Sequence, residues 1–209
     1  MGRALRSSDP STVADPRGLD FTRHMRVVCR DITVRLAEFQ HVDIDRVALR
    51  TCQTRNRAHH GVHASLTPLR FEGGARTTTR RGRTWSIRPI VGEDGREMLY
   101  LLSFYLPRFC NQPLVEKVST IIHELWHIGP AFDGDLRRFP GRYFAHGRSE
   151  AAFHRQMREL AANWLAQSPD RQLFAFLEPD FRGLCQQYGA VYGARIPTPK
   201  LVLQSAASA

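Results

Sequence analysis

The chain has 209 residues, is 42% hydrophobic and carries a formal net charge of +10. This length suffices for one well-cored domain but hardly for two independent domains. No stretch reaches the roughly 18 uninterrupted apolar residues of a membrane helix, and the first twenty residues lack the apolar core of a signal peptide, so we expect a cytoplasmic protein that does not contact membranes.

The first half of the chain predicts one helix followed by strands. We expect residues 1–20 to be disordered and residues 21–39 to form a helix, because apolar side chains recur there at helical spacing. The pattern then changes to apolar and polar alternation, which is typical of strands. Strands are predicted at residues 46–54, at 62–71, around Trp85, Ile87 and Ile90, and at 98–106.

An arginine-rich stretch at residues 76–83 interrupts the predicted strands. Its composition and the preceding Gly73-Gly74 predict a mobile connection. Arginine forms bidentate contacts with phosphate, so the stretch also fits a loop that grips nucleic acid. The alternative is a solvated surface whose arginines reflect genome composition.

The second half of the chain predicts helices. Asn111 or Gln112 can cap a helix with Pro113 in its first turn, and Gly129-Pro130 ends it. Ser149 can cap a further helix to about residue 167, with Phe153, Met157, Leu160 and Trp164 on its buried face. A weaker helix is expected at 171–188. We therefore predict one domain at residues 21–190 and an extended or disordered tail at 191–209.

The helix predicted after Pro113 carries the motif His123-Glu124-Leu125-Trp126-His127. Residues at i and i+4 lie on the same helical face, so both imidazoles can reach one zinc ion at about 2.0–2.1 Å. Glu124 lies at the flank of that pair, where it can act as general base on a metal-activated water. The motif fixes only three identities, and two solvated histidines on a polar helix face would give the same pattern.

The motif resembles the zincin metallopeptidases, and the longer stretch TIIHELWHIGPAFDGDLRRF followed by FAHG is similar to the phage-type metallopeptidases. The resemblance implies an α+β fold, in which a small mixed or antiparallel sheet packs on the H-E-x-x-H helix and helices follow toward the C-terminus. It also implies one zinc ion per chain, bound by His123 and His127, with Glu124 as the catalytic base.

A catalytic zinc ion usually takes three protein ligands. His146, in a glycine-flanked loop before the next helix, is the first choice for the third ligand. Asp133 is the second choice, because an acidic residue six positions after the motif resembles a compact variant of the metzincin spacing. Pro130, however, stands where such families place glycine. Glu150 would suit a gluzincin-like arrangement. Asp133 and Asp135 have an alternative role in shaping the loop by bonding its backbone amides.

Further side chains are weaker candidates. Tyr143 could donate to the developing oxyanion, although a surface tyrosine is the more common case. His59, His60 and His63 form a second cluster that we interpret as solvated loop histidines, and His154 has no evident partner.

The sequence therefore predicts a zinc-dependent peptidase that acts on a protein or peptide substrate. The alternative is a basic nucleic-acid-binding module that uses the arginine-rich surface and holds a structural or vestigial zinc. Hydrolysis of a non-peptide amide also stays open, because an open zinc site with a general base does not define the scissile bond.

Overall fold

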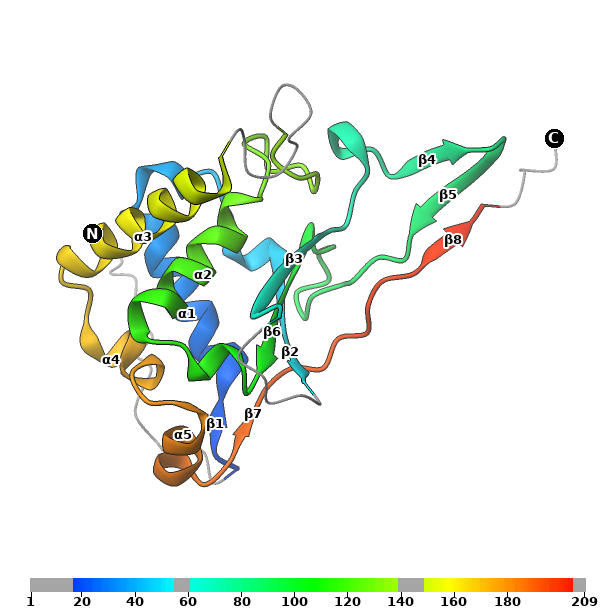
Figure 1. Cartoon of the computed structure of the whole chain (residues 1–209). Coiled ribbons are helices and arrows are strands. Elements are labelled where there is room, and N and C mark those ends of the chain that lie inside the picture. Colours follow the sequence, from blue (N-terminus) through cyan, green and yellow to red (C-terminus); the bar gives the residue numbers. More distant parts are fainter. Residues whose placement is uncertain (1–16, 55–60, 139–148, 205–209) are drawn as a thin grey trace, which may run out of the picture.

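The computed structural model describes residues 17–54, 61–138 and 149–204. Within these ranges the fold is α+β, with five α-helices and three small sheets (Figure 1). In chain order the elements are β1 (Leu19–Asp20), α1 (Phe21–Arg35), β2 (Val47–Gln53), β3 (Ala64–Pro68), β4 (Thr77–Arg80), β5 (Arg83–Ile87), β6 (Tyr100–Leu106), α2 (Leu114–Trp126), α3 (Glu150–Ala166), α4 (Arg171–Phe174), α5 (Phe181–Tyr188), β7 (Val191–Tyr192) and β8 (Leu201–Leu203).

The central sheet has the order β2-β6-β3. Strand β6 pairs in parallel with β2 and antiparallel with β3, so the sheet is mixed, as predicted. The central position of β6 explains its nearly continuous apolar sequence, because a strand that is covered on both faces has no solvated side to fill with polar residues. Strand β3 lies at the edge of this sheet.

Helix α1 is shorter than the predicted helix at 21–39. The side chain of Asp20 caps its first turn by accepting from the amide of Arg23 at 3.1 Å. At Leu36 the backbone becomes extended, with φ −98° and ψ 119°, and a short 3-10 turn at Ala37–Phe39 follows. Leu36 and Phe39 are both buried, so the chain leaves the helical path to place these two side chains in the core.

Helix α2 carries a continuous apolar face. Val118, Ile121 and Leu125 are fully buried and form an apolar stripe, which Ile128 just after the helix continues. The predicted cap was wrong. Pro113 is the N-cap, and its ring has no polar atom that could make a cap bond, whereas the side chain of Asn111 accepts from the amide of Phe181 at 3.1 Å.

Helix α3 begins as predicted, since the hydroxyl of Ser149 accepts from the amide of Ala152 at 3.2 Å. Its buried face is also confirmed, because Phe153, Met157, Leu160 and Trp164 all lie in the core. The indole of Trp164 donates to Asp31 of α1 at 2.8 Å, which ties the two helices together.

The predicted helix at 171–188 was wrong, because it is two helices, α4 and α5, separated by a turn that contains Pro179. Proline lacks an amide proton and interrupts a helix at this point. The buried ammonium of Lys117 in α2 donates to the carbonyls of Leu177 and Pro179, each at 2.7 Å. This lysine therefore holds the interrupted segment against α2. No described helix is both long and apolar enough to cross a membrane.

The two ends of the described chain form strands rather than loose segments. Leu19 and Asp20, which the sequence analysis placed in the N-terminal disordered segment, form β1 and pair in parallel with β7. Leu19 is 1% exposed. Residues in the predicted tail therefore belong to the fold. Strand β7 pairs with β1, and β8 belongs to a separate sheet.

Strands β4, β5 and β8 form an antiparallel sheet that projects from the rest of the molecule (Figure 1), and we call it the β-arm. The predicted mobile connection at residues 76–83 was wrong, because Thr77–Arg80 is a strand and Arg81-Gly82 is a tight turn. Both turn residues have positive φ, 52° and 71°. This is the backbone of the two-residue turn that matches the twist of a β-hairpin.

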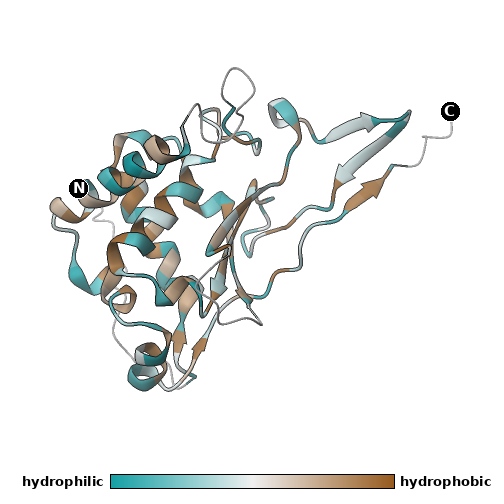
Figure 2. Ribbon diagram, in the orientation of Figure 1, coloured by the Kyte–Doolittle hydropathy of each residue, from teal (hydrophilic) through white to brown (hydrophobic). Residues whose placement is uncertain are grey.

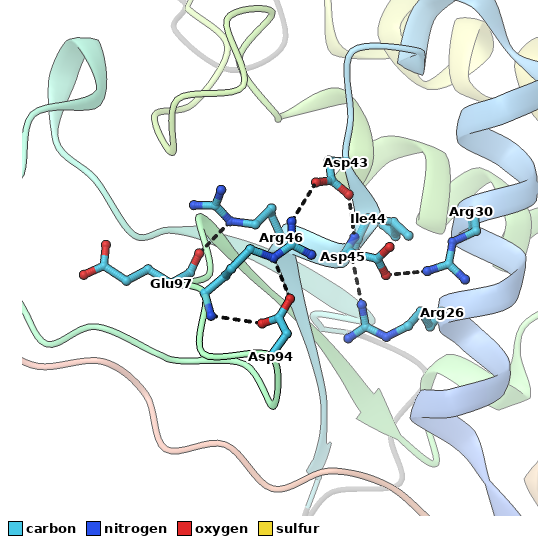
Figure 3. A network of polar contacts seen from close by, with 9 residues as sticks. Arg26, Arg30, Asp43, Ile44, Asp45, Arg46, Asp94 and Glu97 are labelled. Atoms are coloured by element: carbon cyan, nitrogen blue, oxygen red, sulfur yellow. Dashed lines mark hydrogen bonds and ion pairs between the residues drawn. The ribbon is translucent and has the colours of Figure 1, made fainter.

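A network of polar contacts fixes the start of β2 (Figure 3). Arg26 of α1 donates to the carbonyl of Ile44 at 2.8 Å, and Arg30 of the same helix pairs with Asp45. Arg46 donates to the carbonyl of Glu97 at 2.7 Å, which joins β2 to the connection before β6. These contacts position the parallel β2–β6 pair relative to α1.

The burial of α2 can be tested by comparing two aliphatic truncations on that helix. Ile121→Ala should lower the free energy of unfolding by about 2–5 kcal/mol, because it leaves a cavity in the core. Val115→Ala, at a side chain that is 41% exposed, should change it by less than about 0.5 kcal/mol. Urea unfolding followed by circular dichroism measures both, and equal effects would contradict the described packing.

Candidate metal centre

The site lies at the C-terminal end of α2. His123 is in the last turn, and His127 is the C-cap residue with φ −68° and ψ −13°, so the helical geometry extends through both. Their ring centres are 4.8 Å apart, with an angle of 70° between the ring planes. Two imidazoles that share a tetrahedral zinc ion have ring centres about 5 Å apart. The separation of the rings is therefore compatible with one zinc ion between them.

Glu124 stands between the two histidines in sequence, and its side chain is 8% exposed and therefore directed into the protein. Burial raises the pKa of Glu124 to about 7, although a hydrogen bond from the backbone amide of Leu66 in β3 lowers it in part. A carboxyl group with a pKa near 7 is suited to accept and return protons at neutral pH. Its contact with β3 places the edge of the central sheet next to the motif.

Helix α3 packs against α2 and contributes two rings to the site. Phe153 is buried, and its ring centre lies 5.0 Å from that of His123 and 6.3 Å from that of His127. The ring of His154 stacks on His123, with ring centres 5.7 Å apart and an angle of 29° between the planes. The Nε2 atom of His154 also lies 3.5 Å from Oε1 of Glu150.

The place of His154 at the site was not predicted from the sequence. The signal that could have found it is the cap at Ser149 together with the buried position of Phe153, because these two fix which side of α3 faces α2. A residue next to Phe153 on that helix lies at the border of the interface. The sequence alone did not show that α3 packs on the histidine-bearing part of α2.

Of the predicted third ligands, some lie outside the described residues and others have contacts that the structure describes. His146 and Tyr143 lie outside the described residues, as do His59 and His60. Asp133 accepts from the amide of Asp135 at 3.0 Å, and Glu150 pairs with His154. Within residues 17–54, 61–138 and 149–204, no group of three His, Cys, Asp or Glu side chains is placed to hold a metal ion.

Asp135 shapes the loop after α2, as the alternative role predicted. Its carboxylate accepts from the amides of Gly73 and Leu136 at 3.1 and 2.8 Å and from two nitrogens of Arg138, each at 3.0 Å. Burial favours a raised pKa for Asp135, but these hydrogen bonds outweigh it and the net shift is downward. The carboxylate therefore stays charged and joins the loop to the connection before β4.

No protein-family model, curated protein or solved structure matches the chain.

The burial of Glu124 predicts a pH-dependent stability of the metal-free protein. The folded-state pKa of about 7 lies above the ordinary value of 4.5, so the contribution of this group to stability is complete below pH 4.5 and is lost as the pH rises through 7. Glu124→Gln removes the titrating group. Relative to the wild type, this variant should gain on the order of 2–3 kcal/mol between about pH 4.5 and 8.

Urea unfolding of both proteins in the presence of a chelator, at several pH values, measures this gain. Two stability curves that run parallel across the range would show that the carboxyl group is not buried in the free protein.

Proposed function

We propose that this protein is a zinc-dependent peptidase in which His123 and His127 bind the metal and Glu124 is the general base. One observation carries the proposal: two imidazoles with ring centres 4.8 Å apart flank, in sequence, a buried carboxyl group with a pKa of about 7. Solvated histidines on a polar helix face would not need a buried carboxyl group between them, and burying one costs free energy. The arrangement is therefore better explained by chemistry than by stability.

Different residues of the chain would carry out different steps of amide hydrolysis. Zinc, when bound, supplies a Lewis acid that polarises the substrate carbonyl and makes water more acidic. Glu124 takes a proton from the attacking water and delivers it to the leaving amine. Its buried position keeps the pKa close to neutral, so the same group can carry out both transfers. Phe153 covers one side of the histidine pair and limits the access of bulk water.

His146 is the first choice for the third ligand, with Asp133 and Glu150 as the alternatives from the sequence. Asp133, Glu150 and His154 are all described, and none of them forms with His123 and His127 a group placed to hold a metal ion. We therefore expect the third ligand from outside the described residues, where His146 lies. His154 borders the histidine pair, because its ring lies next to that of His123 and its Nε2 atom contacts Glu150.

The sheet edge beside the motif supports a peptide as the substrate. Strand β3 is an edge strand of the central sheet, and its Leu66 amide contacts Glu124. An extended peptide can add to the part of such an edge whose backbone groups are unoccupied, through main-chain hydrogen bonds that are independent of its side chains. A substrate bound there would pass close to the general base. The order of strands, motif helix and following helix agrees with the zincin resemblance.

The mechanism predicts that Glu124→Gln abolishes cleavage of casein or of a quenched fluorescent peptide library, with a loss of at least about 100-fold, while zinc stays bound. Glu116→Gln is the matched control, because it makes the same change on the same helix at a residue that pairs with Arg158 and is remote from the histidine pair in sequence. The control should keep its activity. Cleavage by Glu124→Gln at the wild-type rate would refute the mechanism.

The ligand set predicts how zinc content changes in alanine variants. Elemental analysis of the purified wild type should give one zinc ion per chain, and His123→Ala and His127→Ala should each lose it. The same measurement on His146→Ala, Asp133→Ala, Glu150→Ala and His154→Ala identifies the third ligand, for which we expect His146. Full zinc content in both His123→Ala and His127→Ala would exclude the site altogether.

A further inference from the structure

The β-arm has two faces of different composition. Side chains alternate along a strand, and directly paired residues of antiparallel strands share a face. The pairs Thr78–Trp85 and Arg80–Arg83 therefore lie on one face, together with Leu203, which pairs with Trp85. The opposite face holds only small hydroxyl side chains from β4 and β5, at Thr77, Thr79, Thr84 and Ser86. Within β4 and β5, arginine and the aromatic ring thus lie on one side.

The arginine-bearing face is hollowed. A concavity of about 690 Å³ is lined by Thr78, Arg80, Arg81, Arg83, Trp85 and Leu201. The three arginines are exposed, whereas Trp85 is half-buried. Figure 2 shows a hydrophilic tip between β4 and β5 and a hydrophobic β8 beside it. The concavity thus combines a charged rim with an apolar and aromatic floor.

The charge of the β-arm is not neutralised within the described structure. Residues 77–88 and 198–204 contain Arg80, Arg81, Arg83, Arg88 and Lys200 and no acidic residue. No described carboxylate pairs with the three arginines of the concavity, whereas Arg76, just before the arm, pairs with Glu97 at 3.1 Å. Clustered like charges repel one another, so they favour a partner of opposite charge.

We propose that the concave face of the β-arm binds single-stranded nucleic acid, with the backbone phosphates on Arg80, Arg81 and Arg83 and a base stacked on Trp85. Guanidinium groups bind phosphate in a bidentate manner, and an indole ring stacks on any base. This combination distinguishes nucleic acid from an acidic protein surface, which offers carboxylates but no planar bases at regular spacing. A base inside a duplex is already stacked on both faces and must leave its stack to lie on the Trp85 ring, and this favours a single strand over a duplex.

The proposal predicts a modest and salt-dependent affinity. Three phosphate contacts on a single strand give a slope of about −2 in a plot of log K against log salt concentration. Fluorescence anisotropy of a labelled short oligodeoxythymidine, titrated with the full-length protein, measures this slope. A slope near zero would overturn the proposal, and so would tighter binding of a duplex of the same length.

The two faces provide a matched control for charge. Arg80→Gln with Arg83→Gln removes two positive charges from the concave face, whereas Arg88→Gln with Lys200→Gln removes two from the positions where the same alternation leads to the opposite face. The first double variant should bind at least about 10-fold more weakly than the wild type, and the second should lose less than about 3-fold. Equal losses would mean that binding follows net charge and not this surface.

Stacking is tested at Trp85. Trp85→Leu should weaken binding roughly 5- to 100-fold, and Trp85→Phe should recover most of the loss, because phenylalanine also stacks on bases. Equal affinity of the two variants would overturn the stacking contact. Competition by polyglutamate as effective as by unlabelled oligonucleotide would assign the surface to acidic proteins instead.

This surface does not depend on the candidate metal centre, and the two proposals fail separately. Glu124→Gln should bind the oligonucleotide with wild-type affinity, whereas the Arg80→Gln, Arg83→Gln double variant should still cleave a short peptide. Loss of nucleic-acid binding in Glu124→Gln would contradict the assignment to the β-arm.

Discussion

The site depends on the burial of one face of α2. Helix α2 is rigid, so fixing Val118, Ile121 and Leu125 in the core also fixes the direction of every other side chain on the helix. His123 and His127 lie on the helix face opposite these buried residues, next to α3. No additional constraint is needed to bring their rings together. The apolar stripe that stabilises the fold thus also determines the geometry of the histidine pair.

The same packing also places the side chain of Glu124, but the burial of this carboxyl group lowers the stability of the fold. Glu124 lies between the buried stripe and the histidine face, so the packing that orders α2 also removes water from its carboxyl group. A charged carboxylate is unfavourable there, and the single backbone amide of Leu66 compensates only in part. The protein therefore accepts a local loss of stability at neutral pH. Such a loss persists where a group is used for proton transfer.

The sequence was sufficient for features that depend on local pattern and insufficient for those that depend on packing between distant segments. The closeness of the His123 and His127 rings and the cap at Ser149 depend on local sequence, and both were predicted correctly. The ring contact between His154 and His123 depends on how α3 packs on α2, and no periodicity reports that. The prediction for residues 76–83 was wrong for another reason. Their charge suggested a mobile segment, but pairing between β4 and β5 and the Arg81-Gly82 turn make them part of a hairpin. The third strand of this sheet, β8, pairs with β5 and comes from residues predicted to form a tail.

The arginines of the β-arm differ in their contacts from those in the body of the protein. Arginines in the body of the protein have structural roles: Arg46 donates to a backbone carbonyl, Arg50 donates to Ser103 at 2.8 Å, and Arg138 holds the loop after α2. Those in the concavity of the β-arm pair with no described carboxylate and lie on the one face that also carries a tryptophan. An unneutralised basic surface on a projecting arm can meet an extended polyanion without obstruction from the rest of the fold (Figure 1).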